Sequence, residues 1–182
     1  MTAASRAQSW QQRDVLLGAG SNMGEREKYL EQAATRIQAL PAVSGFCASS
    51  VFYTEPQLVQ NQDWFANQVF LLRCDERWTP LAFLRQLLAI ERDLGRVRLK
   101  QYGPRTLDLD LLLFGQTYLA NPELTLPHPR LHERAFVLVP LLEIRPDFVF
   151  PDGIPASQKL ARLHYRVEGN RIWQGKDPAP FA

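Results

Sequence analysis

Cysteine is scarce in this chain, and its scarcity excludes one class of site. The 182 residues contain two cysteines, Cys47 and Cys74, and their separation matches no zinc-binding pattern. Each lies in a segment rich in strand-forming residues, so we predict two buried free thiols in a reducing compartment. A structural zinc centre is therefore not expected.

Long apolar runs and a strong net charge are also missing. No apolar stretch approaches the roughly 20 residues that a membrane span needs, and residues 1–13 lack the apolar segment of a secretory signal. The 21 basic and 19 acidic residues leave a net charge of +2, which is too balanced to indicate bulk nucleic-acid binding. We therefore predict a cytoplasmic monomer that has neither a membrane nor a nucleic-acid partner.

The composition that remains is that of an ordinary globular protein. Hydrophobic residues make up 46% and charged residues 22% of the chain, which predicts one domain with a sizeable core. We place this domain at residues 14–165, after a flexible leader over 1–13 and before a tail over 166–182. Periodicity and turn residues predict strands over 14–19, 43–54, 65–74, 108–114 and 148–150, and helices over 25–39, 80–94, 135–144 and 157–165.

The most informative pattern is YGPRTLDLDLLLF at residues 102–114. In a strand the side chains alternate between the two faces, so Asp108, Asp110 and Leu112 share one face. The opposite face is then formed by Leu107, Leu109, Leu111 and Leu113. The two aspartate Cα atoms would be about 6–7 Å apart, within reach of one or two Mg²⁺ ions. The alternative interpretation is the solvated face of an edge strand.

A basic stretch immediately precedes this strand. Four cations and no acid fall between residues 96 and 105. A solvated basic loop is the simplest interpretation when the stretch is taken alone. Beside a carboxylate pair, however, the same cations fit a Mg²⁺–polyphosphate ligand, because metal ions and arginines together neutralise the phosphate charge.

Two other segments leave their interpretation open. The loop GAGSNMG at residues 18–24 precedes a helix and forms either a tight turn or a phosphate cradle. His128 lies between two prolines that fix its backbone, so it is either a structural histidine or part of a preset site.

Several motifs, taken together and in order, resemble one enzyme family. These are GAGSNMG, FYTEP, ERDLGRVR, YGPRTLDLDLLLFG and PHPRLHERAFVLVPL, and the match extends over roughly residues 14–153. The chain resembles the 6-hydroxymethyl-7,8-dihydropterin pyrophosphokinase family of folate biosynthesis. The resemblance implies a three-layer α/β (α+β) fold with a ferredoxin-like, mainly antiparallel sheet flanked by helices. It also implies transfer of diphosphate from ATP to the pterin hydroxymethyl group, with AMP as the other product.

The resemblance further implies the roles of individual residues. Asp108 and Asp110 match the aspartates that hold two Mg²⁺ ions, and with Arg96 and Arg105 they form the predicted catalytic set. The predicted ATP site comprises Glu91, Arg96, Arg98, Arg105, Leu111, Thr125, His128 and Arg134. The predicted pterin site comprises Thr54, Glu55, Phe65, Asn67, Tyr102 and Phe136.

The chain departs from the family pattern at a few positions. Gln101 replaces a basic residue, Tyr102 replaces a tryptophan, and residues 57–59 replace a short turn that usually contains glycine. Two alternative functions follow from the sequence. One is a catalytically retired homologue that binds a pterin or a nucleotide. The other is an RNA-binding module, although this chain lacks the paired aromatic strand motifs that such modules use.

Overall fold

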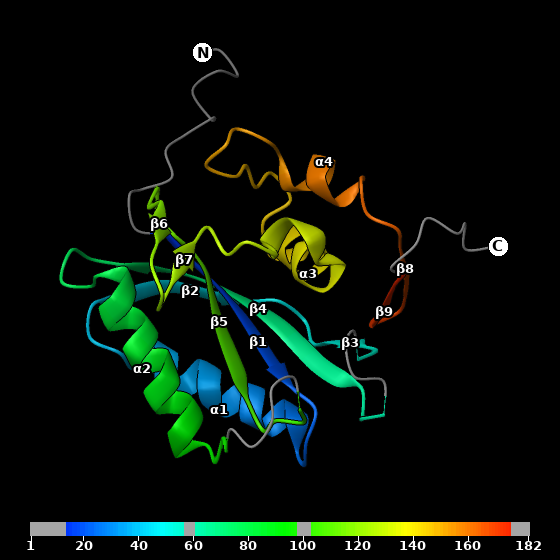
Figure 1. Ribbon diagram of the computed structural model, residues 1–182, viewed down its shortest axis with the longest axis horizontal. Coiled ribbons are helices and arrows are strands. Elements are labelled where there is room, and N and C mark those ends of the chain that lie inside the picture. The colour runs from blue at the N-terminus through cyan, green and yellow to red at the C-terminus, as the bar shows by residue number, and fades with distance from the viewer. Residues whose placement is uncertain (1–13, 57–60, 98–102, 176–182) are drawn as a thin grey trace.

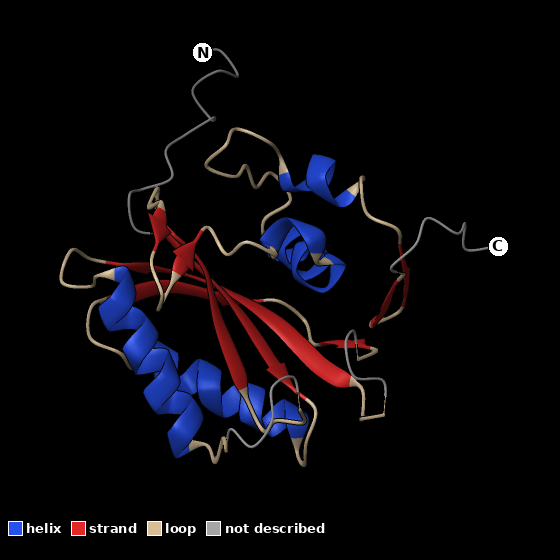
Figure 2. Ribbon diagram, in the orientation of Figure 1, coloured by secondary structure: helices blue, strands red, loops and turns tan. Residues whose placement is uncertain are grey.

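A seven-stranded sheet runs through the middle of the protein, with helices against both of its faces (Figures 1 and 2). The computed structural model describes residues 14–56, 61–97 and 103–175. The leader over 1–13 lies outside these ranges, as does the end of the predicted tail at 176–182. None of the described helices is long and apolar enough to cross a membrane.

The strands of the large sheet follow the order β5-β1-β4-β3-β9-β8, and β2 also pairs with β4. Their bounds are Asp14–Ser21 (β1), Val43–Ala48 (β2), Phe52–Thr54 (β3), Phe65–Cys74 (β4), Asp108–Phe114 (β5), Tyr165–Glu168 (β8) and Arg171–Gln174 (β9). The β3–β9 pair is parallel, which makes the sheet mixed. The predicted helix-flanked α/β architecture is confirmed, whereas its ferredoxin-like antiparallel detail is not.

Two hydrophobic clusters hold the layers together. Helices α1 (Arg26–Gln38) and α2 (Pro80–Asp93) pack with β1, β4 and β5 in the first cluster. Helices α3 (Ala135–Ile144) and α4 (Ala156–Leu160) form the second cluster with the opposite face of the sheet. The Thr79 hydroxyl caps α2 by accepting from the Ala82 amide at 3.2 Å. A small second sheet pairs β6 (Leu119–Ala120) with β7 (Thr125–Leu126).

The alternation predicted for β5 fails at its C-terminal end. Leu16 pairs with Leu113 but Leu17 pairs with Leu111, so a bulge at Leu112 interrupts the register. Because the bulge adds one residue, the side chains after it change faces. Leu113 therefore joins Leu112 in the cluster beneath α3, and Phe114 joins the cluster of α1 and α2. Residues 107–111 keep the predicted alternation.

The predicted strand over 43–54 is two strands, β2 and β3. Between them Ser49 takes over the pairing with β4: its amide donates to the Val69 carbonyl at 3.0 Å, and its hydroxyl accepts from the Val69 amide at 3.0 Å. Cys47 lies on the edge strand β2 and is exposed, so the prediction of two buried thiols is wrong at that position. Cys74 is buried as predicted, and burial raises the pKa of its thiol to about 12.

The C-terminal part differs most from the prediction. Residues 148–150 form an isolated bridge between Val149 and Pro155 instead of a strand, and the predicted helix over 157–165 is the shorter α4. Strands β8 and β9 then form a hairpin that pairs with β3. The sheet thus continues through Gln174, beyond the boundary that we predicted at residue 165.

A polar cluster surrounds the buried Lys159 of α4. Lys159 is 8% exposed and donates to Asp152 at 2.5 Å. His132 packs edge-on against Phe150 with ring centroids 4.7 Å apart, and its Nδ1 has no hydrogen-bond partner among the described residues. Burial and the Lys159 charge lower the pKa of His132, against the opposing effect of Asp152 and Glu133.

This pKa predicts how the stability changes with pH. The folded protein binds fewer protons at His132 than the unfolded chain, whose histidines have a pKa of about 6.5. The contribution of neutral His132 to the unfolding free energy is thus complete above about pH 6.5, and it is lost as the pH falls through the folded-state pKa of His132. We expect His132→Leu to flatten the acid side of a plot of unfolding free energy against pH, measured by urea denaturation.

Exposed His164 provides the matched control, because His164→Leu removes a histidine without emptying a buried site. This variant should retain the slope of the unmodified protein. An equal flattening in both variants would contradict the assignment to His132.

Candidate active site

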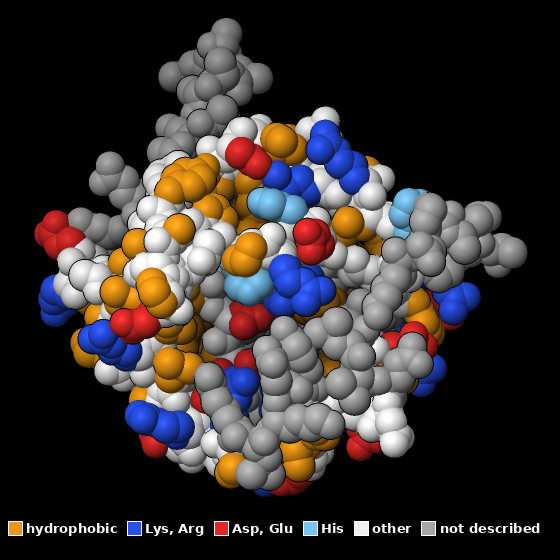
Figure 3. All heavy atoms as spheres, in the orientation of Figure 1, with side chains coloured by type: hydrophobic (Ala, Val, Ile, Leu, Met, Phe, Trp, Pro, Cys, Tyr) orange, Lys and Arg blue, Asp and Glu red, His pale blue; other side chains and the backbone are white. Residues whose placement is uncertain are grey.

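A pocket of about 480 Å³ opens on the α3 side of the sheet, over β1, β4 and β5. Figure 3 shows acidic, basic and histidine side chains gathered around the hollow in the middle of this face. The structure brings most of the predicted site residues to this one pocket. They are Thr54, Glu55, Phe65, Asn67, Arg96, Arg105, Asp108, Asp110, His128, Arg134 and Phe136.

Glycines of β1 form part of the pocket floor. Gly20 pairs with Asp108 and Gly18 pairs with Asp110 across the antiparallel β1–β5 ladder. A Cβ atom at Gly20 would lie 3.2 Å from the Asn67 side-chain oxygen, and one at Gly18 would lie 3.4 Å from Leu112. Larger residues would therefore crowd Asn67 and fill the space beside the carboxylates. Both glycines lie within β1, so the predicted loop over 18–24 starts as a strand.

Two arginines bind the carboxylate of Asp108. Arg96 donates to one of its oxygens at 2.5 Å, and Arg105 donates to the other. Charge-assisted bonds of this kind fix a carboxylate more firmly than neutral ones do. The Asp108 side chain is 25% exposed, so it remains accessible from the pocket.

Glu91 extends this network into the core. Its side chain is 2% exposed, forms an ion pair with Arg96 and accepts from the Leu109 amide at 2.7 Å. Burial lowers the pKa of Arg96, but Asp108 and Glu91 outweigh this effect and raise it, so the guanidinium stays charged. The network joins the end of α2 to the start of β5.

Asp110 has its own basic partner. Arg134 donates to Asp110 at 2.9 Å, and its guanidinium lies 5.5 Å from the centre of the Phe136 ring. Asp110 is 38% exposed, the more open of the two carboxylates. The two aspartates thus face the pocket with different arginines around them.

His128 lies beside Asp110 and is neutral near pH 7. Burial lowers its pKa, Asp110 raises it, and Arg134 and Arg130 lower it again, with a downward net direction. Its Nδ1 accepts from the Arg130 amide at 3.2 Å. The proton of the neutral ring is therefore on Nε2, which is available as a donor.

The remaining pocket wall is aromatic and amide-bearing. Asn67 is 8% exposed and donates to the Thr54 hydroxyl at 2.7 Å. The Arg105 guanidinium lies 5.4 Å from the centre of the Phe65 ring. Such a surface suits a flat aromatic ligand, which can stack on the rings while the amide meets its polar edge.

Other predicted residues are not brought to the pocket. The Leu111 side chain is buried in the cluster of α1 and α2, Thr125 is exposed on β7, and Glu91 lies beneath Arg96 instead of lining the cavity. Arg98, Gln101, Tyr102 and residues 57–59 lie outside the described ranges.

One residue that sequence reasoning missed is Asn22. Asn22 is 2% exposed. Its side-chain oxygen accepts from the backbone amide of Arg105 at 2.8 Å, and its backbone amide donates to the Arg105 carbonyl at 3.1 Å. Its side-chain nitrogen also donates to Gln62 at 3.1 Å. The only sequence signal was its place in the turn after β1, which does not reveal a partner 83 residues away.

The donor set of the pocket fits Mg²⁺. Asp108 and Asp110 provide hard carboxylate oxygens, which Mg²⁺ prefers. Among the described residues, no group of three or more His, Cys, Asp and Glu side chains could hold a metal ion. Mg²⁺ sites in proteins often have only one or two carboxylate ligands, and water and substrate phosphates complete the coordination.

Comparison with known proteins identifies relatives over most of the chain. The family model for 7,8-dihydro-6-hydroxymethylpterin-pyrophosphokinase (HPPK) matches residues 16–146. Proteins named 2-amino-4-hydroxy-6-hydroxymethyldihydropteridine pyrophosphokinase are 40% identical in Methylorubrum extorquens and 35% identical in Bacillus subtilis. The first alignment covers 81% of this chain and 91% of the relative, and the second covers 88% and 90%.

Solved structures share the fold at low sequence identity. A Plasmodium falciparum HPPK-DHPS structure with pteroate matches with a TM-score of 0.63 at 12% identity. The match covers 88% of this chain but 47% of the solved chain, so this chain spans about half the length of that protein. At this identity the likeness shows the fold alone.

The Glu91 network predicts a large effect on stability. Glu91→Leu removes a buried charge from Arg96 and leaves the Leu109 amide without its acceptor. We expect the unfolding free energy to fall by about 3–5 kcal/mol, since breaking a buried ion pair leaves its partner uncompensated. Urea denaturation monitored by circular dichroism measures this loss.

Asp93 on the same helix is the control. It forms an exposed pair with Arg36 at 3.3 Å, and Asp93→Leu should cost at most about 1 kcal/mol. Equal losses for the two variants would show that burial of Glu91 has no special importance.

Proposed function

We propose that this chain, which belongs to the 7,8-dihydro-6-hydroxymethylpterin-pyrophosphokinase family, transfers the terminal diphosphate of ATP to 6-hydroxymethyl-7,8-dihydropterin. The products are AMP and the dihydropterin diphosphate, an intermediate of folate biosynthesis. One observation carries the proposal: a single pocket holds a carboxylate pair among three arginines, beside a wall of aromatic and amide groups.

The arginine end of the pocket is proposed to bind the triphosphate. Arg96, Arg105 and Arg134 are each less than a fifth exposed and converge on the two aspartates. Phosphate oxygens are acceptors of the same kind as carboxylates, so the guanidinium groups can exchange one partner for the other. Glu91 keeps Arg96 in place during this exchange, because its own pair with Arg96 lies below the pocket. The neutral His128 can add a donor.

Asp108 and Asp110 would hold two Mg²⁺ ions with the phosphates. When bound, the ions would neutralise charge on the transferred diphosphate and on AMP. The remaining predicted ATP-site residues, Arg98, Leu111 and Thr125, stay predictions.

The aromatic end is proposed to bind the pterin. Asn67 can meet the ring's donors and acceptors, and its bond to Thr54 fixes the orientation of the amide. Phe65 and Phe136 line the pocket and can contact the faces of a flat ring, and Glu55 also lines it. Tyr102 belongs to the predicted pterin site but lies outside the described residues.

The reaction is a direct displacement at phosphorus. The pterin hydroxymethyl oxygen bonds to the β-phosphorus of ATP, the bond from that phosphorus to the bridging oxygen of AMP breaks, and the hydroxyl proton is released. A carboxylate at the reacting end can accept this proton. Positioning and charge stabilisation suffice, so no protein nucleophile is required.

We further propose that the protein works as a cytoplasmic monomer on small molecules. The balanced charge of the chain supports the absence of a nucleic-acid partner. Sedimentation at micromolar concentration tests the monomeric state.

The function is tested by following both products. Purified protein is incubated with ATP, Mg²⁺ and 6-hydroxymethyl-7,8-dihydropterin, and nucleotides and pterins are separated by chromatography. We expect equimolar AMP and dihydropterin diphosphate, and neither product when EDTA replaces Mg²⁺. Release of ADP would instead indicate transfer of a single phosphoryl group. A retired homologue would bind ligands without releasing AMP.

The carboxylate assignment predicts the effect of Asp110→Ala. Loss of a metal-binding carboxylate should lower kcat by about a thousandfold, because charge on the transferred group is no longer neutralised. The variant should remain folded, since Asp110 is 38% exposed. The rate of AMP release and the near-ultraviolet circular dichroism are measured together.

Asp147→Ala is the matched control. Asp147 is 83% exposed and pairs with Arg145 at 3.5 Å, outside the pocket. It should keep the full rate. Normal turnover by Asp110→Ala would contradict the metal assignment.

A further inference from the structure

The side chain of Gln174, at the end of β9, holds the backbone at the start of α3. Its Oε1 accepts from the Ala135 amide at 2.7 Å, and its Nε2 donates to the Glu133 carbonyl at 2.5 Å. The two bonds bind the peptide groups on either side of Arg134. Gln174 itself does not line the pocket.

Helix α3 needs the Gln174 side chain because its own N-cap residue provides no side-chain acceptor for the first amides of the helix. Arg134 is the N-cap, with extended backbone (φ −114°, ψ 100°) and no side-chain capping bond. The first amides of a helix have no acceptor within the helix. Gln174 satisfies the first of them from 39 residues away, and it also fixes the extended peptide that leads into the helix.

The residue held in this way faces the reacting end of the pocket. Arg134 donates to Asp110 and lies over the ring of Phe136. The position of its guanidinium depends on its backbone, because both flanking peptides are held by one amide side chain. A shift of this backbone would move the cation relative to Asp110.

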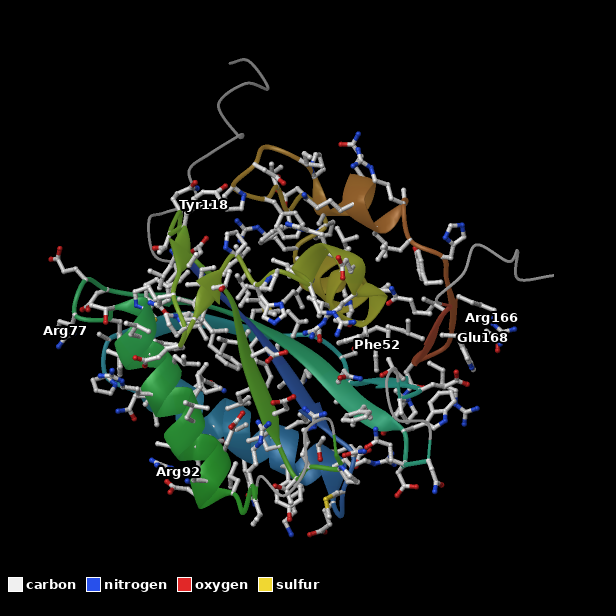
Figure 4. The ribbon with its side chains drawn as sticks, viewed as in Figure 1. Phe52, Arg77, Arg92, Tyr118, Arg166 and Glu168 are labelled. Carbon is white, nitrogen blue, oxygen red and sulfur yellow. The ribbon has the colours of Figure 1, made fainter. Side chains whose placement is uncertain are left out.

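The hairpin that carries Gln174 is anchored to another wall of the same pocket. Strand β9 pairs in parallel with β3, with Ile172 opposite Thr54, and the Tyr53 amide donates to the Asn170 carbonyl at 2.8 Å. Ile172 is 1% exposed and secures β9 in the core. Figure 4 labels Arg166 and Glu168 of this hairpin on the same side of the molecule as Phe52 of β3.

We propose that Gln174 is a positioning residue for the triphosphate end of the pocket and acts through Arg134. This inference rests on the proposed function, since it assigns Arg134 a role in binding ATP. Glutamine suits the task because one planar group offers both a donor and an acceptor. Glutamate keeps only the acceptor, and methionine keeps neither at a similar length.

A double-mutant cycle tests the inference. Affinity for Mg²⁺ and α,β-methylene-ATP is measured by calorimetry for the unmodified protein, Gln174→Met, Arg134→Met and the double variant. We expect Gln174→Met to weaken binding about tenfold, in line with the loss of two hydrogen bonds that fix Arg134. In the Arg134→Met background the same change should have little further effect, because residues that act through one another are not additive.

Two more variants sharpen the result. Gln174→Glu keeps the bond to the Ala135 amide and should lose less affinity than Gln174→Met. If Gln174→Met does not fold, Gln174→Glu replaces it in the double-mutant cycle. Gln158→Met replaces an exposed glutamine on α4 and should bind as the unmodified protein does.

Each outcome supports or overturns the inference. Additive losses, or unchanged affinity in Gln174→Met, would mean that Gln174 does not act through Arg134. Failure of the unmodified protein to bind the analogue and release AMP would contradict the proposed function instead. The two failures are therefore distinguishable.

Discussion

The charge network from Glu91 through Arg96 and Asp108 to Arg105 is the constraint on which the rest of the pocket depends. A carboxylate that is 2% exposed is tolerated only because Arg96 and the Leu109 amide compensate it. The same contacts fix the end of α2 against the first residues of β5. Asp108 therefore lines the pocket from a strand whose position is fixed against α2. Arg96 and Arg105, which could bind a phosphate, already lie beside it.

The sheet beneath this network meets two opposing demands. Near the pocket, β5 must alternate so that Asp108 and Asp110 share a face, and the glycines opposite them must leave space. Farther along, the same strand must cover the underside of α3. The bulge at Leu112 separates the two tasks, because it places Leu112 and Leu113 together in the second cluster after the aspartates have been positioned.

Sequence reasoning succeeded where the signal was local and failed where it was not. The aspartates and the arginines before them lie close together in the chain, so their shared pocket followed from spacing and resemblance. The bulge that moved Leu113 leaves no mark in an unbroken run of leucines. Asn22 and Gln174 gain their roles from backbone groups 83 and 39 residues away, which no periodicity reveals. The exposed Cys47 reflects the edge position of β2, which depends on the complete strand order.

The charge balance of the pocket gives a reason why a nucleotide would require metal ions to bind there. In the described network three carboxylates, Glu91, Asp108 and Asp110, face three arginines. His128 adds no charge near pH 7 because its pKa is lowered. A triphosphate placed there would add negative charge to a group that is already neutral, and the aspartates would repel it. Divalent cations held by the aspartates, as we propose, would reverse that repulsion and free the arginines for phosphate, so metal and nucleotide are expected to bind cooperatively.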